Sequence, residues 1–267
     1  METCSRLAMA AALLSTSACI RWGIPDEDGL AEDTDTDSTT SETNDSGEAD
    51  STDTGPEPWP ESWPFSSESR LVVWGKSGVP TTNLAMLSNI YYHLAGVAPG
   101  EGPLTILWVA DCDPRIDAAG CLAGNVQPFF DMVDVVGTIE FKPLAAVDPT
   151  AYDVIVVDFC EVVEGESIAT LLAEGAGVLA LGDPFCTTPA GTSAALANAT
   201  LGHFGVRFVE HEVYAHDFTV PIEAQVGLLA GVTSLDAWGV ALHETIDPVV
   251  VLLTTLDGAV LSERSEP

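Results

Sequence analysis

Five short runs of apolar residues constrain the fold of this chain more than any other feature. Each run is rich in Val, Ile and Leu and lacks the alternation of polar and apolar residues that marks a strand with one face in water. Runs of this kind are typical of parallel strands that helices cover on both faces. They span residues 70–74, 104–110, 153–159, 177–181 and 249–253.

Stretches with helical periodicity separate these runs. Apolar side chains recur at helical spacing in residues 81–96, where Gly96 ends the pattern, and residues 167–177 and 193–205 are similar. Strands that alternate with helices favour an α/β domain. We therefore predict an open three-layer sandwich with a mainly parallel, Rossmann-like (flavodoxin-like) sheet and right-handed crossovers.

The segment from Arg207 to His243 has a weaker pattern. Residues 207–213 and 237–242 are expected to be edge strands with antiparallel pairing. A short turn of helix is expected near residues 225–230. The sequence shows no internal repeat.

The first 18 residues have the layout of an export signal. Arg6 precedes an apolar run that is shorter than the roughly 20 residues needed to cross a bilayer. The small residues Ser17 and Ala18 then precede Cys19, which resembles a bacterial lipoprotein box, although Thr16 stands where such boxes usually have Leu. We expect Cys19 to be acylated and to anchor the chain without a membrane span. An ordinary secretory signal cut nearby is the alternative.

Residues 19–65 are expected to form an acidic, disordered tether, followed by a folded domain over residues 66–267. The tether is dominated by Asp, Glu, Ser, Thr, Gly and Pro, and such a segment buries too little apolar surface to offset its ordering entropy. Its last aromatic residues, Trp59, Trp63 and Phe65, are interpreted as the point where the tether docks on the domain. A carbohydrate platform is the alternative for these tryptophans.

The charge of the chain excludes one class of partner. The formal net charge is −33, and residues 70–267 alone hold 25 acidic against 6 basic side chains. Nucleic acid is therefore not expected as a partner, since phosphate binding needs a basic face. The expected partners are the membrane, through the lipid anchor, and an envelope protein or a small ligand. Residue 20 is Ile rather than the Asp that retains lipoproteins at the inner membrane, so by resemblance we expect the outer membrane of a bacterial envelope.

Four cysteines belong to the domain. An even set in an exported domain favours two disulfides, and three pairings remain open. A metal site is the alternative, but no CxxC pair supports zinc. The four residues are Cys112, Cys121, Cys160 and Cys186.

Acidic residues follow several of the predicted strands. Because ligands bind beyond the carboxyl ends of parallel strands, these acids are a candidate ligand or cation site. Asp is also common where a turn or helix begins, so capping is the alternative and the more frequent role. The candidates are Asp111, Asp113, Asp158, Glu161 and Asp183. The histidines form no HxxxH or HxH pair, no glycine-rich phosphate loop is present, and no cofactor is expected.

Three phrases carry a family resemblance. They are residues 152–159 (YDVIVVDF), residues 175–184 (GAGVLALGDP) and residues 204–208 (FGVRF). In this pattern the chain resembles the class I glutamine amidotransferase-like superfamily, and within it the non-catalytic branch typified by GldG and IFT-type domains. Catalytic members carry a nucleophilic cysteine on a strained strand-to-helix turn, whereas the equivalent strand here ends with Gly182.

The resemblance and the tether together predict an envelope-anchored lipoprotein whose α/β domain binds a partner without catalysis. The alternative is an extracytoplasmic cysteine- or metal-dependent hydrolase that uses the acids or cysteines at the strand ends. In its cysteine form, Cys160 or Cys186 would be served by His211 or His243.

Overall fold

The computed structural model describes ten stretches of the chain. They are residues 58–75, 84–110, 136–159, 165–182, 187–188, 191–214, 218–222, 225–237, 240–254 and 259–265. The export signal, Cys19 and the acidic part of the tether lie outside these residues. The lipid anchor and the disorder of the tether therefore stay predictions. Within the described residues, no helix is both long enough and apolar enough to cross a membrane.

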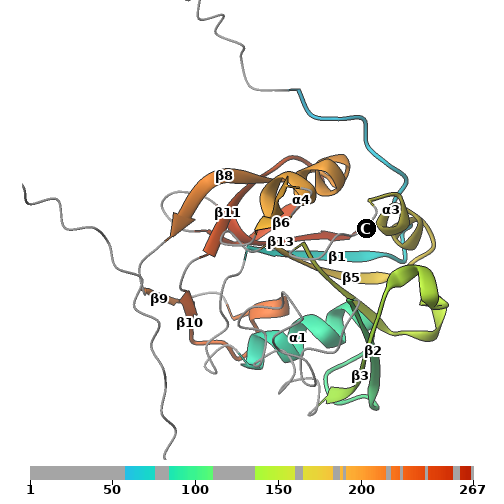
Figure 1. Cartoon of the computed structure of the whole chain (residues 1–267). Helices are drawn as coiled ribbons and strands as arrows, with labels where there is room; N and C mark the ends of the chain where they lie inside the picture. Colours follow the sequence, from blue (N-terminus) through green and yellow to red (C-terminus); the bar gives the residue numbers. More distant parts are fainter. Residues whose placement is uncertain are drawn as a thin grey trace, which may run out of the picture. The chain divides into compact units, whose positions relative to one another are not determined.

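Five parallel strands form one half of a nine-stranded mixed sheet (Figure 1). Their order is β3-β2-β4-β5-β1. Every residue of β4 and β5 is buried, as the unbroken apolar runs predict. The bounds are β1 Arg70–Gly75, β2 Leu104–Val109, β3 Gly137–Lys142, β4 Val154–Asp158 and β5 Gly177–Gly182. The predicted α/β fold with a mainly parallel sheet is confirmed.

The other half of the sheet is antiparallel. Strand β13 (Ala259–Ser265) pairs with β1, and beyond it lie β11 (Val240–Thr245) and the edge strand β8 (Val206–Tyr214). The antiparallel pairing expected after Arg207 is therefore confirmed, and β8 is an edge strand as expected. The edge position expected for residues 237–242 is wrong, because β11 pairs with β13 on one side and β8 on the other. Strand β12 (Val250–Thr254) also pairs antiparallel with β13.

The prediction for residues 249–253 is wrong in one respect. The run does form a strand, β12, but it is neither parallel nor buried on both faces, since Val250 is 59% exposed and Val251 is 41% exposed. The reason is its position: β12 follows the chain reversal after β11 and pairs with a strand that already has β1 on its other side. Apolar composition alone does not distinguish this environment from a central one.

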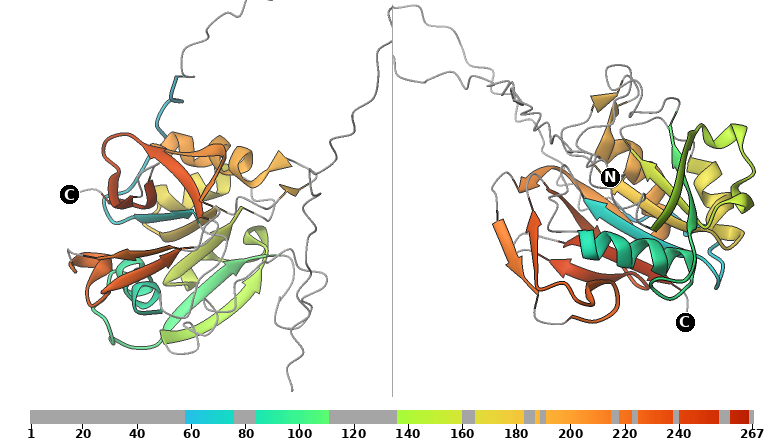
Figure 2. Two further views of the ribbon diagram at one scale, coloured as in Figure 1. Left: turned by 90° about the vertical axis from the view of Figure 1, so that its left-hand side faces the viewer. Right: turned by 90° about the horizontal axis from the view of Figure 1, so that it is seen from below.

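Helices cover both faces of the sheet, as Figures 1 and 2 show. Helix α1 (Leu84–Ala95) packs on the face that carries Val72 and Trp74, whereas α3 (Gly165–Ala173) and α4 (Ser193–Leu201) pack on the face that carries Leu71 and Val73. Successive strand residues point to opposite faces, so one apolar strand supplies both cores. The three layers of the predicted sandwich are therefore present.

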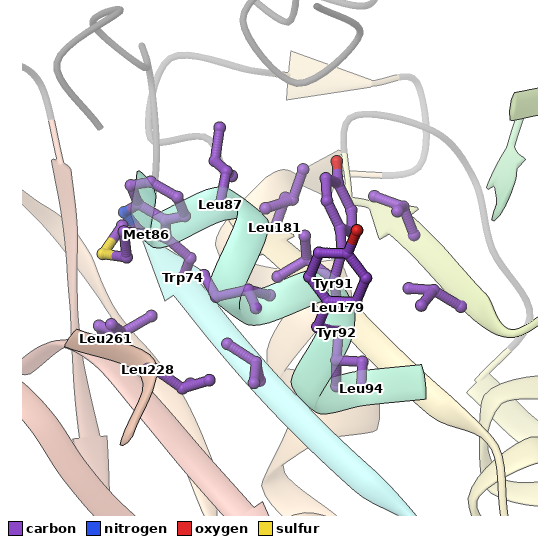
Figure 3. Close-up of a cluster of buried hydrophobic side chains, with 14 of the residues drawn as sticks. Trp74, Met86, Leu87, Tyr91, Tyr92, Leu94, Leu179, Leu181, Leu228 and Leu261 are labelled. Atoms are coloured by element: carbon purple, nitrogen blue, oxygen red, sulfur yellow. The ribbon is translucent and has the colours of Figure 1, made fainter. Parts of the chain in front are cut away.

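The core beneath α1 is drawn in Figure 3. Met86, Leu87, Ile90 and Tyr91 of the helix are completely buried, and they recur at the spacing that places them on one side of a helix. Burial of a side chain of this size contributes about 1.5–3 kcal/mol. Gly96 follows α1 with a φ of 72°, a left-handed conformation that ends helices and that glycine adopts at little cost.

Short elements complete the chain. The turn of helix expected near residues 225–230 is η5, and it is held to α1 because Asn89 Nδ2 donates hydrogen bonds to Leu228 O at 3.0 Å and Ala230 O at 2.8 Å. The remaining elements are η2 Leu144–Ala146, η3 Pro149–Ala151, η4 Gly202–Phe204, η5 Gly227–Leu229, the paired strands β6 Thr187–Thr188 and β7 Gly191–Thr192, and the paired strands β9 Phe218–Pro221 and β10 Ser234–Ala237.

The outer edge of β8 is closed by a side chain of α4. Asn198 Nδ2 donates to Phe208 O at 2.8 Å, and Asn198 Oδ1 accepts from Phe208 N at 2.6 Å. The amide thus satisfies the two backbone groups that a further strand would otherwise pair with, which protects an edge strand from unwanted pairing.

The segment Pro58–Phe65, which we call the strap, docks on the domain. Trp63 and Phe65 pack against the core beneath α3 and α4, and Trp59 lies against Arg207, whose Cζ is 4.4 Å from the ring centroid. The docking role predicted for these three aromatic residues is confirmed. Since residues 66–69 then lead directly into β1, the strap lies at the end of the sheet where the parallel strands begin.

Candidate functional site at the carboxyl edge

Four neighbouring parallel strands end side by side at one edge of the sheet. We call this the carboxyl edge, and it consists of Gly75, Val109, Asp158 and Gly182, with Gly75 opposite Gly182 and Asp158 opposite Leu181. Strands β2 and β4 are neighbours, but the connection after β2 leads outward to β3 and the connection after β4 leads in the opposite direction to β5. Such a divergence between adjacent strands is where open α/β sheets bind ligands.

Asp158 is the one residue of the predicted acidic set that the structure describes. It is the last residue of β4 and is only 1% exposed, so it differs from an acid on a solvent-exposed turn. Burial of a carboxylate is costly unless other groups compensate its charge or hydrogen-bonding capacity. The other predicted members, Asp111, Asp113, Glu161 and Asp183, lie outside the described residues.

Gly182 ends β5 at a point where no side chain fits. A Cβ atom built on Gly182 would lie 2.4 Å from Phe208 Cζ and less than 3 Å from two further atoms of that ring. Phe208 is 3% exposed, and Asn198 holds both of its backbone polar groups. The ring therefore has little room to move, and the packing requires glycine at this position.

A buried polar pair adjoins Phe208. The His243 ring meets the Phe208 ring edge to face, with centroids 5.5 Å apart, and its Nε2 lies within hydrogen-bond distance of Ser262 Oγ at 2.7 Å. His243 is 2% exposed and Ser262 is fully buried. The second ring nitrogen of His243, Nδ1, is buried and has no hydrogen-bond partner in the described part of the chain.

Burial lowers the pKa of His243 to about 3, because a cation is unfavourable in an apolar interior. The imidazole is therefore neutral at the pH of most environments. A general base must reach the proton that it abstracts, and a side chain that is buried and already hydrogen-bonded does not offer that access. The geometry of His243 favours a structural role over the catalytic one considered for it.

Two further histidines have structural contacts. His93 Nε2 lies 2.9 Å from Glu263 Oε1, and this contact is the main reason that the pKa of Glu263 falls below its ordinary value. His203 stacks on Trp63 of the strap. The side chain of His211 and all of His216 lie outside the described residues.

The cysteine predictions are not tested. Cys112, Cys121, Cys160 and Cys186 lie outside the described residues, as does Cys19. Across the described stretches, no three His, Cys, Asp or Glu side chains gather in a way that could hold a metal ion. The predicted disulfides and the competing metal site both stay open.

The edge strand β3, together with Tyr152 just before β4, carries a polar network that the sequence analysis did not predict. Glu140 Oε2 accepts hydrogen bonds from Lys142 Nζ at 2.5 Å and from Tyr152 OH at 2.6 Å. The bond from Lys142 is the main reason that the pKa of Glu140 is lowered. Glu140 and Lys142 alternate with apolar residues along the edge strand β3, which was the only available signal.

Two shallow hollows adjoin Tyr152, near the end of the sheet where the parallel strands begin. One has a volume of about 200 Å³ and lies between Pro149 and Gly175, and the other, of about 140 Å³, is bordered by Thr105 and Thr138. Both are smaller than the roughly 300–1,000 Å³ typical of ligand sites. Thr105 and Asp153 are already hydrogen-bonded to each other at 2.7 Å. The polar groups here fasten strand ends, and the carboxyl edge is the better candidate site.

Comparison with known proteins finds no matching family model and no similar curated protein.

Proposed function

We propose that this protein is an envelope-anchored lipoprotein whose α/β domain binds a partner or small ligand without catalysing a reaction. The observation that carries the non-catalytic part is the packing at Gly182, because the Phe208 ring occupies the space that any side chain there would need. The covalent chemistry of the catalytic members would need a nucleophilic side chain at this strand end.

The family resemblance supports the same proposal. In the glutamine amidotransferase-like superfamily the catalytic cysteine sits where β5 turns into the next segment, and this chain has Gly182 at that point. The mixed, mainly parallel sheet is compatible with the resemblance. Membership of the non-catalytic GldG/IFT-type branch is part of the proposal and rests on the phrases in residues 152–208.

The proposed binding surface is the carboxyl edge. The strap reaches the domain at the beginning of β1, whereas Asp158 and Gly182 lie at the ends of the parallel strands. The strap therefore leads into the sheet at the opposite end from the strand ends at which binding is proposed. The excess of acidic residues favours a cationic ligand or a protein with a basic surface, and it disfavours nucleic acid.

Acylation of Cys19 is tested by expressing the full chain in a bacterial host and measuring the mass of the mature N-terminus. We expect a diacylated Cys19 as the first residue and recovery of the protein with membranes. Cys19→Ala should release it to the soluble fraction, because a lipid chain is its only proposed attachment. Cys4→Ala is the matched control, since Cys4 lies in the leader that is removed. A mature start elsewhere, without a lipid, would contradict the anchored function.

A further inference from the structure

Each aromatic side chain of the strap contacts a different basic or imidazole group of the domain. Trp59 lies under Arg207 at 4.4 Å, and Phe65 lies under Arg264 at 4.5 Å, measured from guanidinium carbon to ring centroid. Trp63 stacks on His203 with centroids 3.8 Å apart and an interplanar angle of 2°. A guanidinium over an aromatic face contributes about 0.5–1 kcal/mol at an exposed site.

Backbone hydrogen bonds align the strap with the same groups. Arg207 Nη2 donates to Pro58 O at 2.7 Å, and His203 Nδ1 lies 2.6 Å from Glu61 O, to which it can only donate. Trp63 N in turn donates to His203 O at 3.2 Å. Arg207 and His203 therefore each hold one ring and one carbonyl group of the strap.

The strap has no regular secondary structure of its own. Pro58, Pro60 and Pro64 restrict it to an extended conformation, which lowers the entropy that it loses on docking. Its side chains are half-buried or exposed, in contrast to the fully buried residues of β4 and β5. Segments with few buried contacts open at a lower free energy than the core to which they are attached.

Directly after the strap the chain is fixed more firmly. Ser66 N donates to Leu172 O at 2.9 Å, and Ser69, which is 1% exposed, also bonds to Leu172 O through its hydroxyl group. Residues 66–69 therefore hold their place at the start of β1. A release of the strap would end at this point.

We propose that residues 58–65 form a releasable strap that gives the tether two lengths. In the docked state the free part of the tether ends before residue 58, because residues 58–65 are held against η4 and β8. In the released state the tether gains eight residues, which at about 3.3–3.6 Å per residue add up to about 27 Å of reach. The gain in reach rests on the anchored function proposed above, whereas the release of the strap is a property of the domain and is independent of acylation.

Hydrogen exchange of the full chain at single-residue resolution tests the proposal. The reporter is the Trp63 amide, which is bonded to His203 O, and the reference amides are those of Val156 and Leu179 in β4 and β5. We expect the Trp63 amide to be protected, but less than the reference amides. A Trp59→Ala/Trp63→Ala double variant should increase exchange at residue 63 by about 5- to 30-fold and leave the reference amides unchanged.

Ser62→Ala is the matched control, because Ser62 lies in the strap and its side chain is exposed. It should leave exchange at residue 63 unchanged. Three results would overturn the proposal: a Trp63 amide that exchanges at the rate of an unstructured peptide in the wild type, a double variant that behaves like Ser62→Ala, or an equal loss of protection at residue 63 and in β4 and β5. The last result would mean that the strap opens only when the domain unfolds. None of these measurements depends on a lipid at Cys19.

Discussion

The buried imidazole of His243 makes the stability of the domain depend on pH in a defined range. Its pKa is about 3 in the folded protein, and an unperturbed histidine in the unfolded chain has a pKa of about 6.5. Between these two values the unfolded state binds a proton that the folded state does not. Stability therefore rises with pH across this range and is lost as the pH falls from about 6.5 toward 3.

The magnitude follows from linkage. One proton changes the free energy of unfolding by about 1.4 kcal/mol per pH unit, so the total loss between the two pKa values is about 5 kcal/mol. Between pH 7 and pH 5 alone the loss is about 2 kcal/mol. With a urea dependence of about 2–3 kcal/mol per molar, this moves the unfolding midpoint by about 0.7–1 M.

The assay is urea unfolding of the full chain at pH 7, 6 and 5, comparing the wild type with His243→Gln. Glutamine does not titrate and can still bond to Ser262, so the variant should lose about 2 kcal/mol less than the wild type between pH 7 and pH 5. Ser262→Ala is the control: it removes the partner of Nε2 but keeps the imidazole, so it should be less stable throughout and retain the wild-type slope. Equal slopes for the wild type and His243→Gln would refute the reasoning.

Three further predictions concern packing and hydrogen bonds, and urea unfolding at pH 7 checks each of them. Gly182→Ala should destabilise the domain by about 1–3 kcal/mol through overpacking against Phe208, and Phe208→Leu in the same chain should recover part of the loss; an additive double variant would contradict the contact. Asn198→Leu should cost about 2 kcal/mol or more, because it leaves the backbone N–H and C=O of Phe208 without their partner; a neutral result would mean that water replaces the amide. Tyr91→Phe should be neutral or stabilising by up to about 1 kcal/mol, since the Tyr91 hydroxyl is buried and has no hydrogen-bond partner in the described stretches; a loss of stability would show that it has one.

Four of the five parallel strands could be predicted from sequence because they are apolar on both faces, whereas the edge strand β3, which alternates polar and apolar residues, was not predicted. Unbroken runs such as residues 154–158 and 177–182 have few alternatives to burial, and the helices between them carry clear periodicity and a glycine stop. Contacts with distant residues were therefore not needed to identify these elements as strands and helices. The position of each strand in the sheet, in contrast, depends on crossovers that composition does not encode.

Strand β13 was missed for a physical reason. It lies in the middle of the sheet between β1 and β11, yet its sequence includes Ser262, Glu263 and Arg264. Each of these polar residues has a specific partner: Ser262 pairs with His243, Glu263 with His93, and Arg264 donates to Phe204 O at 3.1 Å. A buried polar residue is stable only with its partner, and residues that lie far apart in the sequence supply these partners.

The candidate site was predicted only in outline. The rule that ligands bind beyond the ends of parallel strands placed it at the carboxyl edge, and Asp158 lies there. The sequence also identified Gly182 as the position without a nucleophile, but it could not show why glycine is required. That reason is Phe208, which is 26 residues away in the chain and reaches Gly182 only because of the order of the sheet.

The central claim is that the domain binds without catalysis, and the reactivity of its thiols tests this most directly. The measurement is peptide mapping by mass spectrometry after the full chain reacts with an electrophilic glutamine analogue near neutral pH. The account predicts no adduct at any cysteine in the folded protein, because a domain that binds without catalysis needs no activated thiol. Rapid stoichiometric labelling of Cys160 or Cys186, abolished by unfolding, would contradict it and support a cysteine hydrolase.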